Sequence, residues 1–152
     1  MHVIAFRQNP ASGPNGADEI HPIADLQTHL PRADFVALTC PLTTETEGLI
    51  GPAAFAAMKQ SAFLINAARG RCVDEPALAI ALSTHQIAGA GIDVTYDEPL
   101  AQDSPLWTLE NAFITPHTAG ETRRYEDNVL DILIENLGRL GRGKTDLFNQ
   151  VV

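Results

Sequence analysis

Three side chains in the sequence could together bind a small acid and move a proton. Arg69 follows one apolar run, Glu98 follows another, and His117 lies after a third, between Pro116 and Gly120. A guanidinium grips a carboxylate through two hydrogen bonds, and an imidazole titrates near neutral pH. A carboxylate beside that imidazole fixes its tautomer and favours the imidazolium. The set predicts an acid-binding, proton-transferring site, although each residue alone could equally be an ordinary loop side chain.

These residues must be positioned by strands and helices that alternate along the chain. The strands are apolar throughout rather than alternating, which indicates a parallel sheet with both faces covered in an α/β fold. Carboxyl ends of parallel strands meet at one edge, so the three side chains are expected there. Residues 11–18, rich in Gly, Pro and Asn, predict a loop. Strands are predicted at residues 3–6, 35–39, 62–65, 87–94 and 112–115, and helices at 23–30, 52–58, 75–83 and 121–140.

Composition limits the class of protein. The 152 residues suffice for one domain with a sizeable core, and 45% hydrophobic with 19% charged residues is ordinary for a soluble protein. The net charge of -9, without any run of Lys or Arg, argues against a protein that binds nucleic acid. The two isolated cysteines, and the lack of a signal peptide or membrane span, predict a cytoplasmic protein. No metal site is expected, because His2, His21, His29 and His85 match no motif.

The order of several short motifs resembles the D-isomer-specific 2-hydroxyacid dehydrogenases. The resemblance covers roughly residues 1–150 and implies a Rossmann-like doubly wound parallel sheet. It implies a partial NAD(P)-binding domain at residues 1–120, and a C-terminal helix and tail at 121–152 that returns toward a substrate domain. The motifs are Asn66-Ala67-Ala68-Arg69-Gly70, Gly91-Ile92-Asp93-Val94, Glu98-Pro99, Ser104-Pro105-Leu106-Trp107 and Pro116-His117-Thr118-Ala119-Gly120.

The resemblance implies an oxidoreductase that moves a hydride between NAD(P)H and a small 2-oxo or 2-hydroxy acid, with glyoxylate and hydroxypyruvate as first candidates. Arg69 would bind the substrate carboxylate and polarise the C2 carbonyl. His117 would give the carbonyl oxygen its proton, and Glu98 would be the partner of His117. Relatives that oxidise formate carry an amide at the place of Glu98, so a glutamate favours 2-hydroxy acids. The resemblance also implies a homodimer.

The resemblance further implies which residues contact the dinucleotide. Family members that use NAD usually end the strand at residues 3–6 with an acidic residue for the ribose 2′-OH. Here that strand ends in Arg7. A guanidinium suits a 2′-phosphate, so NADP is favoured over NAD, with a solvent-facing arginine as the alternative. The other implied contacts are Cys40, Pro41 and, more weakly, Thr46 toward the ribose and pyrophosphate, and Ala67, Arg69, Asp93, His117, Ala119 and Gly120 toward the nicotinamide.

The sequence contains no GxGxxG turn, because Val94 occupies the third glycine position after Gly89 and Gly91. By resemblance, Met1 corresponds to the start of the second Rossmann strand, so the first strand and its phosphate-binding turn are absent. That strand is central in the order 3-2-1-4-5-6. We therefore expect a chain that alone is unstable or self-associates through unpaired edges, and that binds dinucleotide weakly. A dinucleotide-sensing corepressor-like protein and an inactive fragment remain alternatives.

Overall fold

The computed structural model describes residues 1–8 and 16–149 and forms two compact units, Met1–Ala119 and Gly120–Val152. Most of the loop predicted at residues 11–18 lies outside the described residues. Every helix among the described residues is too short or too polar to cross a membrane.

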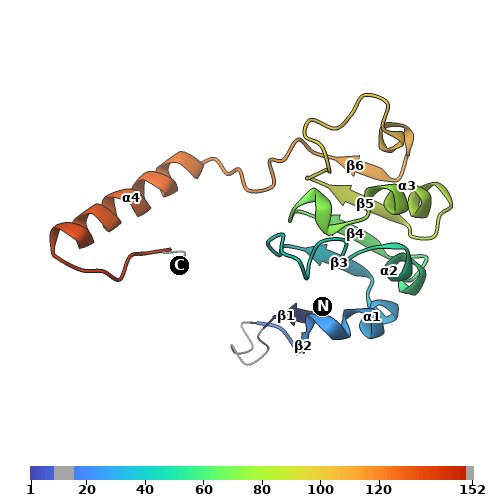
Figure 1. Cartoon of the computed structure of the whole chain (residues 1–152), viewed down its shortest axis with the longest axis horizontal. Helices are drawn as coiled ribbons and strands as arrows, with labels where there is room; N and C mark the ends of the chain where they lie inside the picture. The colour runs from blue at the N-terminus through green and yellow to red at the C-terminus, as the bar shows by residue number, and fades with distance from the viewer. Residues whose placement is uncertain (9–15, 150–152) are drawn as a thin grey trace. The chain divides into compact units, whose positions relative to one another are not determined.

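The described residues of the first unit form six strands, and all of their pairings are parallel (Figure 1). Strands β1 (Ile4–Arg7) and β2 (Glu19–Pro22) form a two-stranded sheet. The order β3-β4-β5-β6 makes a separate four-stranded sheet. The parallel α/β Rossmann-like fold is therefore confirmed, and so is the gap expected where a central strand would join the two sheets. The four strands are β3 (Phe35–Leu38), β4 (Phe63–Asn66), β5 (Gly89–Ile92) and β6 (Ala112–Ile114).

Strand β2 was not among the predicted elements. Its sequence, Glu-Ile-His-Pro, is too polar to stand out as a buried strand. Only pairing with β1, in the register Ile4↔Glu19 to Arg7↔Pro22, makes the segment a strand. The remaining strands fall within the predicted ranges or are displaced by one residue. The displacement arises because the ends of a strand depend on which residues of the neighbouring strand pair with it.

Short helices follow the strands. The helix predicted at residues 23–30 is instead three consecutive turns, because Pro31 has no N–H with which to continue an α-helix. Helix α3 (Glu75–Ser83) has the predicted bounds, since the Asp74 side chain accepts the N–H of Ala77 at 2.9 Å as an N-cap. The helical segments of this unit are η2 (Ile23–Asp25), α1 (Leu26–His29), η3 (Leu30–Arg32), α2 (Pro52–Ala57), η4 (Gly70–Cys72), α3, and η5 (Pro105–Thr108).

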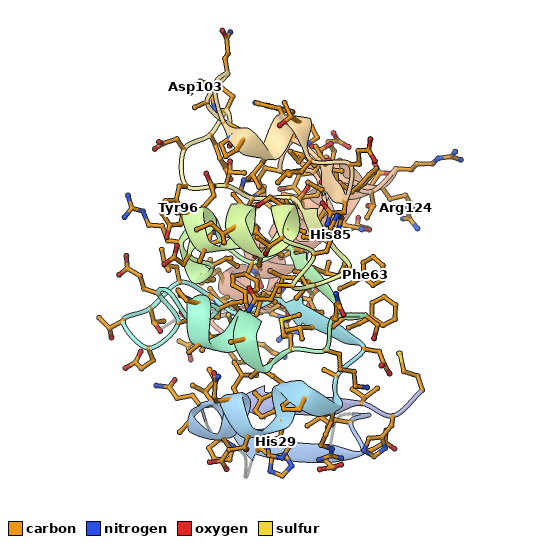
Figure 2. All side chains as sticks on the ribbon, turned by 90° about the vertical axis from the view of Figure 1, so that its right-hand side faces the viewer. His29, Phe63, His85, Tyr96, Asp103 and Arg124 are labelled. Atoms are coloured by element: carbon orange, nitrogen blue, oxygen red, sulfur yellow. The ribbon has the colours of Figure 1, made fainter. Side chains whose placement is uncertain are left out.

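Helices α1, α2 and α3 all lie on the same face of the strands (Figures 1 and 2). On that face Val36, Leu38 and Leu64 are buried in the core with the fully buried Phe55 of α2. The expectation that both faces are covered is wrong within this unit, because the opposite face is exposed. The chain steps from β3 to β6 in one direction, so right-handed crossovers place every connecting helix on one side. The exposed face carries Phe35, Phe63, Ile65 and Phe113, which are 64%, 40%, 39% and 71% exposed.

The second unit is dominated by α4 (Tyr125–Gly141). The helix begins four residues later than the predicted residue 121 and ends one residue later than the predicted residue 140. It starts late because the N–H of Tyr125 bonds the Thr122 carbonyl in a turn. Gly143, with φ of +71°, supplies the left-handed residue that commonly follows a helix. The apolar side chains of α4 recur at helical spacing and are exposed, for example Val129, Leu133 and Leu137.

Candidate active site

The loops that follow β3, β4, β5 and β6 contain the residues with predicted chemistry. Because these strands are parallel, their carboxyl ends meet at one edge of the sheet, where open α/β folds bind ligands. Two clefts open at this edge, and they share Leu42 and Arg69. The first is lined by residues 39–42 and 67–69, and the second by Arg69, Glu98 and His117 together with Leu42, Gly70, Arg71, Thr95 and Tyr96.

His117 and Glu98 form a direct pair in the second cleft. The Nδ1 atom of His117 lies 2.8 Å from Oε2 of Glu98, and the two side chains are 47% and 40% exposed. The hydrogen bond from His117 lowers the pKa of Glu98 below its usual value, with help from the backbone N–H of Thr95. A carboxylate only accepts, so Nδ1 carries the proton of the neutral ring and Nε2 is left for another molecule.

Asp93 holds the loop that carries His117. Its buried carboxylate accepts the Thr115 hydroxyl and the backbone N–H groups of Thr118 and Ala119, the last two at 2.9 Å each. Burial alone would raise the pKa of Asp93, but these hydrogen bonds outweigh it and lower the pKa. The N–H of His117 bonds the Asp93 carbonyl at 2.9 Å. Asp93 therefore fixes the loop, and its predicted contact with the nicotinamide stays a prediction.

Asn66 shapes the loop that carries Arg69. Its buried side chain accepts the N–H of Ala68 at 3.1 Å and donates to the Arg69 carbonyl at 3.2 Å. The Arg69 guanidinium donates to the Ala68 carbonyl at 2.6 Å and lines both clefts. The sequence alone predicts no role for Asn66. The signal that could have identified it is an asparagine at the carboxyl end of a buried strand, where it turns the backbone.

Gly70 brings the loop after β4 into contact with the loop after β5. A Cβ atom at this position would lie 2.0 Å from the carbonyl oxygen of Thr95. No side chain fits at that distance, so only glycine lets the loop after β4 touch the loop after β5. This close approach places Arg69 near the carboxylate of Glu98, and the positive charge of Arg69 contributes to the lowered pKa of Glu98.

The first cleft contains several of the predicted dinucleotide contacts. Cys40, Pro41, Ala67 and Arg69 line it. Thr46 lines neither cleft, because its buried hydroxyl donates to the Pro41 carbonyl at 2.7 Å and accepts the N–H of Thr43 at 2.7 Å. It therefore shapes the turn that presents Cys40 and Pro41.

The other predicted dinucleotide contacts do not line the first cleft, and they stay predictions. Arg7 is the half-buried last residue of β1. The N–H of Ala119 is used by Asp93, and Gly120 belongs to the second unit. The first cleft suits a dinucleotide because it lies at the carboxyl ends of β3 and β4, where open α/β sheets bind ligands.

Comparison with known proteins adds a family assignment to this geometry. A family model described as the NAD-binding domain of the D-isomer specific 2-hydroxyacid dehydrogenases matches residues 1–119. The glyoxylate/hydroxypyruvate reductase B of Klebsiella pneumoniae (strain 342) is 50% identical over 113 residues, which is 74% of this chain and 35% of that protein. The chain thus spans about a third of the length of the curated relatives that it matches.

Solved structures agree with this assignment. A D-isomer specific 2-hydroxyacid dehydrogenase from Xanthobacter autotrophicus Py2, in complex with NADPH and MES, superposes with a TM-score of 0.85 at 34% identity and covers 98% of this chain and 60% of its own. An NADPH-dependent glyoxylate/hydroxypyruvate reductase from Sinorhizobium meliloti, in complex with NADP and sulfate, gives a TM-score of 0.84 at 27% identity. That match covers 97% of this chain and 47% of the other.

Proposed function

This chain belongs to the D-isomer-specific 2-hydroxyacid dehydrogenase family, and we propose that it carries the catalytic side chains of an NADPH-dependent reductase of small 2-oxo acids. The observation that carries the proposal is the hydrogen-bonded pair of His117 and Glu98 in one cleft with Arg69. Glyoxylate and hydroxypyruvate are the proposed substrates, because the relative at 50% identity is named as a reductase of both.

Arg69, His117 and Glu98 have different roles in the proposed reaction. Arg69 binds the substrate carboxylate through two hydrogen bonds and polarises the neighbouring C2 carbonyl. His117 donates its proton from Nε2 to the carbonyl oxygen as that oxygen becomes a hydroxyl. Glu98 holds the imidazole through Nδ1 and favours its protonated form before transfer. A bound nicotinamide dinucleotide supplies the hydride that reaches C2, and the first cleft would hold it between Cys40-Pro41 and Ala67.

Removing the imidazole tests this assignment. In the variant His117→Ala, reduction of glyoxylate and hydroxypyruvate by NADPH should slow by roughly 10²- to 10⁴-fold, the usual contribution of a general acid. The affinity for the dinucleotide should stay unchanged. His85→Ala is the matched control, because His85 is exposed beside α3 and lines neither cleft (Figure 2). The proposal is wrong if His117→Ala keeps the wild-type rate, or if the wild-type protein reduces neither acid.

We also propose that NADP is preferred over NAD because of Arg7. This residue ends β1, where an acidic side chain would otherwise accept the ribose diol. Two structurally similar proteins at 34% and 27% identity were solved with NADPH and NADP, which supports this choice.

Cofactor kinetics test the choice directly. The wild-type kcat/KM should favour NADPH by roughly 10- to 100-fold, as a charge-assisted contact would give. The variant Arg7→Asp should reverse the order by removing the cation and restoring an acceptor for the diol. Equal or better efficiency of the wild-type protein with NADH would end the proposal.

The compartment and the oligomeric state are also proposed, from the resemblance to the family. The protein would work in the cytoplasm as a homodimer, with the second unit reaching toward a substrate domain. Sedimentation equilibrium at the concentration of the assay tests the dimer, and a monomeric active species would contradict it.

A further inference from the structure

A second cluster of chemically active side chains lies away from the two clefts, at the β1–β2 sheet. Glu19 and His21 are two residues apart on β2, and His29 is the last residue of α1. One ligand atom from each of these three half-buried residues lies within 4.8 Å of the others. His2, just before β1, places its Nε2 2.7 Å from Oε1 of Glu19. We propose that this cluster is a binding site for a divalent transition metal, with zinc as its best match.

The donor types and their spacing suit zinc. Zinc takes imidazole nitrogens and carboxylate oxygens at about 2.0–2.1 Å in tetrahedral sites, which puts neighbouring donors roughly 3.3 Å apart. The His21 Nε2 atom lies 3.0 Å from Oε2 of Glu19, and the His2 contact is 2.7 Å. An ion bound between His21 and Glu19 needs to part these two donors by only about 0.3 Å. The His29 donor, which lies within 4.8 Å of both, would move inward to complete the set. Two imidazoles and one carboxylate, from His21, His29 and Glu19, would supply three ligands, and a water molecule would complete four-coordination.

His29 already has the support typical of a metal-bound histidine. Its Nδ1 atom lies 3.0 Å from the Asp25 carbonyl oxygen. A carbonyl only accepts, so the proton is on Nδ1 and the lone pair is on Nε2. Histidine ligands commonly donate their second N–H to a backbone carbonyl in this way, which fixes the ring. The His29 ring also lies against His21, with ring centroids 4.2 Å apart, and edge-on to Phe6 at 5.4 Å.

Arg32 is the competitor for the proposed site. Both of its terminal nitrogens hydrogen-bond the Glu19 carboxylate. An arriving cation must share or displace this guanidinium, because the two cations would repel each other at one carboxylate. Removing Arg32 should therefore tighten metal binding. A role limited to an ion pair predicts no such gain, so this variant separates the two explanations without removing any ligand.

The ion would join β2, through Glu19 and His21, to α1, through His29. The β1–β2 pair is a separate two-stranded sheet, so an ion bound at this edge would stabilise the smaller of the two sheets. Binding to the folded state alone raises stability by mass action. The inference does not depend on the proposed function, since its readouts are metal binding and thermal stability.

Titration of the full chain with metal ions tests the site. After treatment with a chelator, the protein should bind one Co²⁺ with the visible d–d absorption of a tetrahedral complex, and Zn²⁺ should displace it and raise the melting temperature. Single variants His21→Gln and His29→Gln should each weaken Zn²⁺ binding by more than the roughly 10- to 100-fold cost of losing a supporting contact. Arg32→Gln should bind Zn²⁺ more tightly than the wild type.

The control variant is His85→Gln. His85 is an exposed histidine of the same unit and lies beside α3, whereas His29 ends α1 (Figure 2). The His85→Gln variant should leave Zn²⁺ binding unchanged. Far-ultraviolet circular dichroism should confirm that every variant is folded. The proposal is overturned if Co²⁺ gives no tetrahedral spectrum. It is also overturned if the folded His21→Gln and His29→Gln proteins bind Zn²⁺ as tightly as the wild type.

Discussion

His117 adopts a left-handed backbone conformation, with φ of +56°. For a residue with a Cβ atom this region costs about 1 kcal/mol or more and persists only where the surroundings enforce it. Here the enforcement is visible, because Asp93 binds the N–H groups of His117, Thr118 and Ala119 through its carbonyl and carboxylate oxygens. The strained backbone of His117 and the hydrogen bonds that hold it therefore lie at the proposed proton donor. The buried Asp93 thus orients His117 by binding the backbone of its loop, and not by a hydrogen bond to the imidazole.

The pairing of Glu98 with His117 predicts the pH dependence of that carboxylate. Because the pKa of Glu98 is lowered in the folded protein, its pairing contributes to stability fully above the pKa of an unfolded glutamate. The contribution is lost as the pH falls through the lowered folded value. Titration of the Glu98 carboxyl carbon by NMR should therefore give a midpoint below that of an ordinary glutamate.

The matched variant identifies the cause of this shift. In His117→Gln the midpoint for Glu98 should move up toward the ordinary value, because the hydrogen bond from His117 is the largest cause of the lowered pKa. In His85→Gln the midpoint should not move. A midpoint for Glu98 that is unchanged in His117→Gln would show that the contact is absent in solution.

At the scale of elements, the site is a meeting of loops rather than of helices. Asn66 turns the chain after β4, and Asp93 anchors the turn after β6 from the end of β5. Gly70 sets the distance between the loops after β4 and β5. Parallel strands bring these loops to one edge, but side-chain-to-backbone bonds fix their shapes. The geometry of the candidate site therefore depends on Asn66, Asp93 and Gly70 as well as on the side chains that line the clefts.

Gly70 provides the test at this scale. In Gly70→Ala the added methyl group meets the backbone of Thr95 and forces the two loops apart, so the free energy of unfolding should fall by about 1–3 kcal/mol, as other overpacked sites do. Turnover should fall as well. Gly51→Ala is the control, because a Cβ there would make an ordinary contact of 3.6 Å with Gly48. Equal denaturation midpoints for the two variants would contradict the inferred close approach.

At the scale of the whole molecule, the first unit has one well-packed face and one bare face. The packed face carries helices α1, α2 and α3 (Figure 2). The bare face carries aromatic side chains, of which Phe35 and Phe63 stack with ring centroids 5.7 Å apart. Exposed apolar surface of this kind usually marks an interface or leads to association. The expectation of self-association made from unpaired strand edges thus acquires a second reason in the exposed face.

Replacing two of these phenylalanines tests the consequence of the bare face. The wild-type chain should bind the dye ANS and self-associate in sedimentation experiments. The double variant Phe35→Thr/Phe113→Thr should do both less, with little loss of stability, because both side chains are already exposed. By contrast, Leu64→Ala on the packed face should cost about 2–5 kcal/mol. A wild-type chain that is monomeric and binds no dye would contradict this prediction.

The sequence by itself determined the parallel α/β class and the residues of the candidate site. Apolar runs and caps such as Asp74 act within a few residues along the chain, so their consequences can be read locally, as the agreement at α3 illustrates. The motif order placed Arg69, Glu98 and His117 after three strands. Because parallel strands end together, their gathering at one edge followed from that order.

Only the tertiary structure decided the remaining features. The strand β2, the one-sided placement of the helices, the contact of Gly70 with Thr95 and the gathering of His21 with Glu19 and His29 all involve partners that local composition does not specify. These contacts arise from strand register and crossover handedness, which act between segments distant in the sequence. Packing therefore assigned Asp93 and Asn66 their supporting roles, because buried polar groups must find hydrogen-bond partners wherever the fold provides them.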